Sequence, residues 1–188
     1  FKEFEFEGEQ TATISIDNDG KIWFIDRPSN RIGFLNQGIN TMQTIELPNI
    51  EPVDLESYPT FILADHNNDI WITLLAKNVI LQYSQNTNEF REFVMPTENS
   101  GPFALVLDQS NNVWFSESNS GKIGFIDSTT HEIKEFERKD NPIKSPESLI
   151  FDKNGNLWIT EHTGTALVKF NPIPETTYQI HHYAQPKV

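Results

Sequence analysis

Residues 152–161, DKNGNLWITE, contain the pattern that decides the fold of this chain. Related segments begin at three earlier aspartates: DNDGKIWFID at 17–26, DHNNDIWITL at 65–74 and DQSNNVWFSE at 108–117. In all four segments the tryptophan follows the aspartate by six positions, and the chain has no other tryptophan. The tryptophans stand at 23, 71, 114 and 158, so the segments recur at intervals of 48, 43 and 44 residues.

Each segment has the composition of a β-hairpin. A run of alternating apolar residues ends at the aspartate, and a run of β-branched and aromatic residues follows the turn. In the third segment Leu105 and Leu107 precede Asp108, and the second run begins at Val113. Between the two runs lies a cluster of Asn, Asp and Gly, residues that bond their own backbone or adopt left-handed conformations in tight turns. The pattern therefore predicts strand, turn and strand, and nothing in the turn requires a ligand.

Two further strands are predicted in each repeat. The third surrounds an aliphatic residue nine positions after the tryptophan, at Ile32, Ile80, Ile123 and Leu167. The fourth carries residues 19 and 22 positions after the tryptophan: Met42 and Ile45, Phe90 and Phe93, Ile133 and Phe136, Thr177 and Ile180. Four short antiparallel strands at this period are typical of a β-propeller blade. The alternative, a β-sandwich, would have to explain four matched Asp–Trp intervals by coincidence.

We therefore predict an all-β chain, 1–188, that forms one partial β-propeller domain with blades at about 8–47, 58–96, 101–137 and 145–184. The opening FKEFEFE, 1–7, alternates like the outer strand of a preceding blade. An open arc of blades would expose two apolar faces, because each blade buries its faces against its neighbours. The remaining blades are expected either from a longer chain with six or seven blades or from a second copy.

The composition limits the partners. The chain has 14 Lys and Arg against 27 Asp and Glu, a formal net charge of -13. Such a surface repels phosphate, which argues against nucleic acid and anionic membranes as partners and suits a cation or a basic protein, although solvation alone also explains it. The absence of cysteine excludes disulfides, thiolate metal sites and a cysteine nucleophile. No apolar run approaches the length of a membrane span.

The repeat resembles that of the virginiamycin B lyase family and, more loosely, that of the NHL-repeat propellers. The resemblance is clearest in DQSNNVWFSESNSGKIGFID at 108–127 and extends over essentially the whole chain. It implies a seven-bladed propeller whose channel mouth holds Mg²⁺ on glutamates and uses a histidine as general base to open a lactone by elimination. The residue types suit that chemistry, because a hard cation takes carboxylate oxygens and neutral histidine accepts a proton.

The resemblance implies three site residues at the ends of the second strands. Glu117 and Glu161 occupy the Trp-x-x-Glu position and are the candidate ligands for Mg²⁺ or Ca²⁺. Asp26 and Leu74 stand at the same position in the first two repeats. His162 follows Glu161 directly and is the candidate catalytic base. These carboxylates are expected to reach the channel mouth, where the loops between the fourth and first strands also lie.

A structural interpretation of the same residues stays open, in which the carboxylates pair with Lys122, Arg31 or Lys77 or face water. The chain also departs from the family where Pro-His or Pro-Tyr is often found, because the equivalent pairs are Thr11-Ala12, Pro59-Thr60, Pro102-Phe103 and Pro146-Glu147. A calcium loop beginning at Asp65 lacks the required glycine and distant glutamate, so turn chemistry accounts for it better.

Two functions follow. The first is a propeller scaffold or binding module, located outside the cytoplasm, that engages a protein or a small ligand at the channel mouth. The second is a Mg²⁺-dependent lyase or lactonase of the virginiamycin B lyase type. The fold alone does not choose between them, so the sequence leaves open whether the protein is an enzyme. A histidine brought to the mouth by further blades would favour the enzyme. The four tryptophans are predicted to be core residues rather than a stacking groove.

Overall fold

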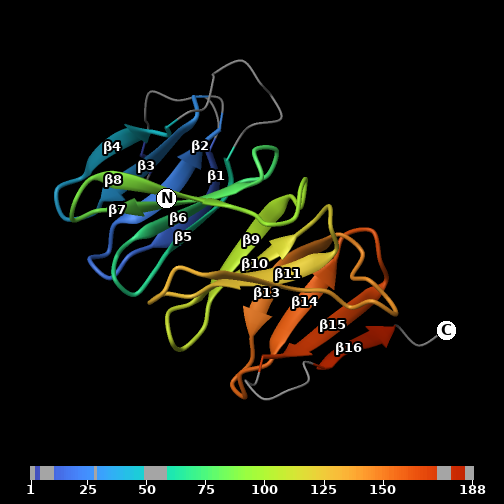
Figure 1. The fold of residues 1–188 in the computed structure, drawn as a ribbon. Coiled ribbons are helices and arrows are strands. Elements are labelled where there is room, and N and C mark those ends of the chain that lie inside the picture. The colour runs from blue at the N-terminus through green and yellow to red at the C-terminus, as the bar shows by residue number, and fades with distance from the viewer. Residues whose placement is uncertain (1–2, 5–10, 28, 49–58, 173–178, 185–188) are drawn as a thin grey trace. The chain divides into compact units, whose positions relative to one another are not determined.

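The computed structural model describes residues 3–4, 11–27, 29–48, 59–172 and 179–184, with side chains up to residue 172. The regular structure of these residues is entirely β-strand (Figure 1). The part of the chain that is described contains no helix long and apolar enough to cross a membrane. The chain divides into an N-terminal unit, residues 1–93, and a C-terminal unit, residues 94–188.

The strands of the N-terminal unit form two blades. The first is β1 (Thr11–Ile16), β2 (Ile22–Asp26), β3 (Arg31–Asn36) and β4 (Thr41–Glu46). The second is β5 (Pro59–Ala64), β6 (Ile70–Leu74), β7 (Val79–Ser84) and β8 (Glu89–Val94), whose last residue falls in the next unit. Each blade is a four-stranded antiparallel sheet in which the strands pair in sequence order.

The C-terminal unit repeats this arrangement. Its blades are β9 (Pro102–Leu107), β10 (Val113–Glu117), β11 (Lys122–Ile126) and β12 (Ile133–Phe136), then β13 (Pro146–Phe151), β14 (Leu157–Glu161), β15 (Ala166–Asn171) and β16 (Gln179–Ala184). The prediction of an all-β chain built from four-stranded antiparallel blades is confirmed. Of the outer strand predicted at 1–7 only Glu3 and Phe4 are described, so that strand stays a prediction, and Thr177 of the predicted fourth strand also lies outside the described residues.

The repeated interval of six residues has a direct physical cause. In every blade the aspartate Oδ2 accepts the indole N–H of the tryptophan at 2.9 Å, in the pairs Asp17–Trp23, Asp65–Trp71, Asp108–Trp114 and Asp152–Trp158. The other oxygen, Oδ1, accepts the backbone N–H groups two and four positions on, at 2.7–3.0 Å. One carboxylate thus fixes both the turn and the tryptophan ring.

The Gly and Asn residues of the turns adopt the left-handed backbone conformation that the sequence predicts. The residue three positions after each aspartate has a positive φ, at Gly20 (78°), Asn68 (67°), Asn111 (65°) and Gly155 (78°). Glycine and asparagine tolerate this left-handed conformation better than other residues. The predicted tight turns are confirmed, and hydrogen bonds to the turn's own backbone engage the Asp65 carboxylate.

Replacing Asp108 with alanine is expected to lower the free energy of unfolding by about 2 kcal/mol, because the turn amides and the indole N–H of Trp114 lose a charged acceptor. Urea unfolding followed by tryptophan fluorescence measures the loss. The control is Asp127→Ala, which removes a partly exposed turn carboxylate that accepts the backbone amides of Thr129 and Thr130. That variant is expected to lose clearly less stability than Asp108→Ala. Equal losses in the two variants would contradict a special role for the Asp–Trp bond.

The core of each unit lies between its two blades. In the N-terminal unit Trp23, Ile25 and Ile32 of the first blade pack with Ile62, Ala64, Ile70 and Ile72 of the second. In the C-terminal unit Trp114 and Ile123 pack with Leu157, Ile159, Val168 and Phe170 of the last blade. Within each unit the tryptophan side of the first blade is therefore covered by the second blade.

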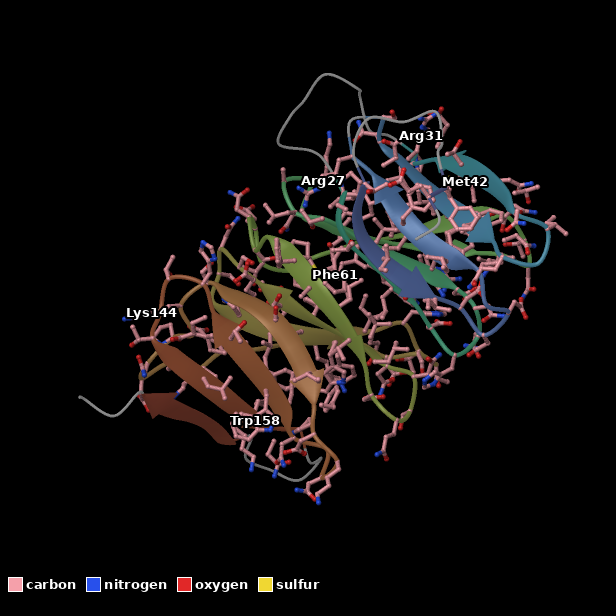
Figure 2. All side chains as sticks on the ribbon, turned by 180° about the vertical axis from the view of Figure 1, so that it is seen from behind. Arg27, Arg31, Met42, Phe61, Lys144 and Trp158 are labelled. Atoms are coloured by element: carbon pink, nitrogen blue, oxygen red, sulfur yellow. The ribbon has the colours of Figure 1, made fainter. Side chains whose placement is uncertain are left out.

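The prediction of core tryptophans is confirmed for Trp23, Trp71 and Trp114, which are buried. It is wrong for Trp158, which is only partly buried (Figure 2). The physical reason is its place in the last blade. No later blade is described that could cover the tryptophan side of β13–β15.

Candidate functional site

The predicted site residues occupy one equivalent position in the four blades, the last residue of the second strand. Asp26, Leu74, Glu117 and Glu161 pair with the first residue of the neighbouring strand, which is Thr11, Pro59, Pro102 and Pro146 respectively. In every blade the register then shifts within the next few residues. Such bulges re-aim side chains at strand ends, which makes this rim the natural place to look for a site.

Glu117 is completely buried at the end of β10. Its Oε2 accepts the hydroxyl of Ser120 at 2.6 Å, within the turn that leads to β11. Its Oε1 is buried and accepts no hydrogen bond. A buried carboxylate oxygen without a donor is costly as an ionised group, so Glu117 is poised to hold a proton.

Burial raises the pKa of Glu117 to about 7, and the negative charge of Glu135 on β12 pushes it in the same direction. Glu135 also lies within hydrogen-bonding reach of Glu117, so a proton on Glu117 can be donated to the Glu135 carboxylate. In the ionised form of Glu117 the Ser120 hydroxyl would still donate to Oε2, whereas Oε1 has no donor. The two carboxyl groups act as a pair that shares one proton.

Glu135 is the ionised member of the pair. Hydrogen bonds from Thr97 and Lys122 hold its pKa below the ordinary value, although burial opposes them. Thr97 donates its amide N–H at 3.0 Å and its hydroxyl at 2.5 Å to Glu135, and the Lys122 Nζ lies 3.2 Å from Glu135 Oε2. Lys122 also donates to the Thr97 hydroxyl at 2.6 Å. A lysine thus already supplies positive charge beside these carboxyl groups.

Glu161, at the end of β14, organises the loops around it. Its Oε1 accepts the backbone N–H of Lys144 at 2.8 Å, and its Oε2 accepts that of Ala166 at 3.2 Å. The carboxylate also packs so closely on Gly164 that a side chain there would collide with it. Glu161 therefore holds together the segments before β13 and before β15.

His162 is well exposed, and its Nδ1 lies 3.3 Å from Oε2 of Glu147 on β13. Its backbone N–H bonds to the carbonyl of Ser145 at 2.9 Å, a residue with a φ of 52°. The carboxylate of Glu147 can orient the imidazole and leave Nε2 facing outward, if Nδ1 carries the proton.

In the N-terminal unit Asp26 fills the equivalent position, and its Oδ2 forms an ion pair with Arg31 at 2.7 Å (Figure 2 labels Arg31). Arg31 also donates its Nε–H to the same oxygen at 3.3 Å. Arg31 is directly opposite Asp26 in the pairing of β2 with β3. The structural interpretation of this position therefore holds for Asp26.

The described residues do not fit a Mg²⁺ site by themselves. Among them, no group of three or more His, Asp and Glu side chains gathers closely enough to hold a metal ion. The backbone amides of Lys144 and Ala166 already bind the two carboxylate oxygens of Glu161, which a hard cation would need. The assignment of Glu117 and Glu161 as ligands, and of His162 as base, stays a prediction.

Two partners in these clusters escaped the sequence analysis. The sequence analysis did not consider Glu135, although its register with Gly124 places it on the same face as Phe115 and Glu117. Glu147 was noted only as a departure from the family pattern. Pro146 pairs with Glu161, and this register places the next residue, Glu147, beside His162.

The chain belongs to the virginiamycin B lyase family, whose model matches residues 1–187. A virginiamycin B lyase from Staphylococcus aureus is 28% identical, with a TM-score of 0.79 over 95% of this chain. A streptogramin B lyase structure is 23% identical, with a TM-score of 0.85 over 98% of this chain. The present chain spans 56% and 58% of these two proteins.

A more distant structural likeness shows the fold alone. A gluconolactonase from Xanthomonas campestris has a TM-score of 0.70 at 9% identity, with 95% of this chain and 64% of that one covered. No curated protein matches the sequence. The shared architecture is thus that of lyases and lactonases, while the activity of this chain has to be argued from its own residues.

Proposed function

We propose that this chain is part of a propeller scaffold that binds a protein or a small ligand at the rim formed by the ends of its second strands. One observation carries the proposal: two of the carboxylates at this rim, Asp26 and Glu161, are bound by neighbouring residues of the chain. Arg31 pairs with Asp26, and backbone amides bind Glu161. Side chains held in this way shape a rigid rim for recognition rather than a free ligand set for a catalytic metal.

Titration with Mg²⁺ and Ca²⁺ tests the structural role of these carboxylates. Isothermal calorimetry of the wild type and of the double variant Glu117→Gln/Glu161→Gln is expected to give the same weak heats. The matched control is the double variant Glu132→Gln/Glu147→Gln, which also removes two carboxylates of the C-terminal unit. Divalent binding that is at least tenfold weaker in the first double variant alone would contradict the proposal and establish a metal site.

A second candidate is lactone opening of the virginiamycin B lyase type. Membership in the family supports it, and so does the contact between His162 Nδ1 and Glu147, which would present Nε2 as a proton acceptor. A catalytically inactive Staphylococcus aureus enzyme has been solved with quinupristin, which makes that compound a suitable probe.

Under the scaffold proposal, quinupristin incubated with the protein and Mg²⁺ is expected to stay intact in liquid chromatography. Conversion to a linear isomer would favour the lyase instead. In that case His162→Ala should reduce the rate at least 100-fold, because general bases contribute about 10²–10⁴-fold. Glu147→Gln should reduce it less, because the histidine would remain.

The proposal includes a location outside the cytoplasm. Fractionation of cells that express the native gene with a C-terminal tag tests it. Recovery of the protein from the cytosolic fraction would overturn this part of the proposal.

A further inference from the structure

The turn between β13 and β14 contains the pair Asn154 and Gly155, and nowhere else in the sequence does a glycine follow an asparagine. Such a pair is chemically reactive. Glycine has no side chain, so its backbone nitrogen can approach the carboxamide of the preceding residue closely. This reactivity does not depend on ligand binding or on catalysis at the rim.

The repeat explains why this pair occurs in a turn. The positive φ three positions after each aspartate favours glycine or asparagine, and the four residues there are Gly20, Asn68, Asn111 and Gly155. The residue before it is exposed in every blade, as Asp19, Asn67, Ser110 and Asn154. It is exposed even in the first and third blades, on which another blade packs, so its exposure does not depend on a missing neighbour. The fourth turn alone combines an asparagine with a following glycine.

The side chain of Asn154 is not held in place. It is exposed, and its carboxamide makes no hydrogen bond to the residues that the structure describes. Asn156 in the same turn differs, because it is buried and its Nδ2 donates to both carboxylate oxygens of Asp152, at 3.0 and 2.8 Å. No atom lies within 4 Å of the place where a Cβ of Gly155 would stand. The space beside the Gly155 backbone is therefore open.

The hydrogen bonds of the turn restrain this reactivity. The backbone N–H of Gly155 donates to the carbonyl of Asp152 at 3.0 Å, and that of Asn154 donates to Asp152 Oδ1 at 2.8 Å. The Gly155 nitrogen can attack the carboxamide only when the turn opens, and exposed turns open locally at a lower free energy than the whole fold. Asp152 is thus a positioning residue that keeps the turn closed.

We propose that Asn154 is a site of spontaneous deamidation. The backbone nitrogen of Gly155 loses its proton to water and attacks Cγ of Asn154, which forms a cyclic succinimide. The Asn154 Nδ2 takes up a proton and leaves as ammonia. Water then opens the ring: its addition at Cγ gives aspartate, and its addition at the main-chain carbonyl carbon gives isoaspartate. Water is the only other reactant, and no group is oxidised or reduced.

The products alter both the charge and the turn. A carboxylate replaces a neutral carboxamide, so the formal net charge of -13 becomes more negative by one unit. In isoaspartate the main chain runs through Cβ and Cγ, which lengthens the turn by one atom. Asp152 Oδ1 then loses the geometry in which it accepts the backbone amides of residues 154 and 156. The bond from the Trp158 indole to the same carboxylate is weakened with it.

Incubation of the folded chain at mildly alkaline pH, followed by digestion and mass spectrometry, tests the proposal. The peptide with Asn154 is expected to gain the mass of deamidation before any other asparagine peptide, and fragmentation should identify isoaspartate. Gly155→Asn, the residue of the second and third turns, fits the φ of 78°. This variant should react at least about tenfold more slowly, because a side chain on residue 155 obstructs ring closure. Asn154→Ser, as in the third turn, should abolish the mass change.

A second pair of variants tests the restraint by the turn. Asp152→Ala should speed deamidation at least about threefold, because the turn opens more often without this acceptor. Asp108→Ala is the matched control, since it opens the equivalent turn of the third blade and should leave the rate at Asn154 unchanged. Equal rates in these two variants would overturn the role of Asp152. Deamidation that begins at another asparagine, or that proceeds as fast in Gly155→Asn as in the wild type, would overturn the proposal. Circular dichroism checks that each variant is folded.

Discussion

Replacing Gly33 with leucine is expected to lower the free energy of unfolding by about 3 kcal/mol, the upper range for an overpacked core. Phe24→Ile alone is expected to lower it by about 1.5 kcal/mol, through a partly refilled cavity. The double variant Phe24→Ile/Gly33→Leu is expected to lie within about 1 kcal/mol of the wild type, because the two changes compensate.

The reason is a close contact between neighbouring strands. Phe24 on β2 pairs directly with Gly33 on β3. A Cβ atom on Gly33 would lie 2.7 Å from Phe24 Cε2 and 2.9 Å from Cε1, and nearer still to Cζ. The phenyl ring thus occupies the space above the glycine, and any larger residue must displace it. Gly33 is required by this contact and not by a left-handed backbone.

The chain itself contains the compensated versions of this pair. In the second blade the equivalent residues are Ile72 and Leu81, and in the fourth they are Ile159 and Val168, all of them directly paired and buried. The third blade repeats the large–small combination with Phe115 and Gly124. Each blade therefore fills the same space either with a phenyl ring and no side chain or with two aliphatic side chains.

Urea unfolding of the wild type, both single variants and the double variant measures the coupling, which is expected to be about 4 kcal/mol. Gly20→Ala is the control for glycine replacement, since no atom lies within 4 Å of its Cβ and only its φ of 78° opposes the change. That variant should lose about 1 kcal/mol. Additive losses in the cycle would show that the two positions do not share one space.

The fold was predictable because its determinants are local and repeated. Asp17 and Trp23 stand six residues apart for a reason that operates within one hairpin, and the same interval recurs in every blade. The compensation between residues 24 and 33 could also be read from the sequence once the strand register is known, because directly opposed side chains must share a fixed volume.

The candidate site was less predictable because its contacts are not local. Glu117 was singled out by its place after Trp114, but its protonation depends on Glu135 across the sheet and on burial that sequence does not report. Glu147 reaches His162 only because the register shifts between Pro146 and Leu149 at the start of β13. Such a bulge changes which side chains contact each other, and no single residue in the sequence indicates its presence.

The partial exposure of Trp158 was missed for a different reason. Its segment matches the other three in every respect, so sequence reasoning assigns it the same buried environment. Burial depends on the blade that follows, as the packing of Trp114 against Leu157 and Ile159 shows. A repeat sequence thus predicts the surface that a blade presents but does not reveal what covers it.

The variant Glu117→Gln is expected to be more stable than the wild type at pH 8 by about 3 kcal/mol and equally stable near pH 4.5. Glu117 has a pKa of about 7 in the folded chain against an ordinary value of 4.5. Between these values the unfolded chain releases this proton while the folded chain keeps it. The contribution of Glu117 to the free energy of unfolding is therefore largest below pH 4.5. It falls as the pH rises toward 7 and stays low above that pH.

Glutamine fits the same surroundings without a charge. Its amide oxygen can accept the Ser120 hydroxyl, and its amide N–H can donate to Glu135 in place of the shared proton. Glu135 does not affect the measurement in this pH range. Its pKa is lowered, so its stabilising contribution is present above its ordinary pKa of 4.5 and is lost only as the pH falls below 4.5. The window from pH 4.5 to 7 therefore isolates Glu117.

Chemical unfolding of the wild type and the variant at several pH values gives the difference in their free energies of unfolding as a function of pH. The contributions of the histidines cancel in this difference, because both proteins contain them. The exposed Glu132→Gln provides the matched control. A flat curve for Glu117→Gln would mean that Glu117 is ionised at neutral pH. Repeating the series with Mg²⁺ then decides its role. A proton-sharing carboxyl predicts no added stability from the metal, whereas a metal ligand predicts a stabilisation of the wild type that the variant loses.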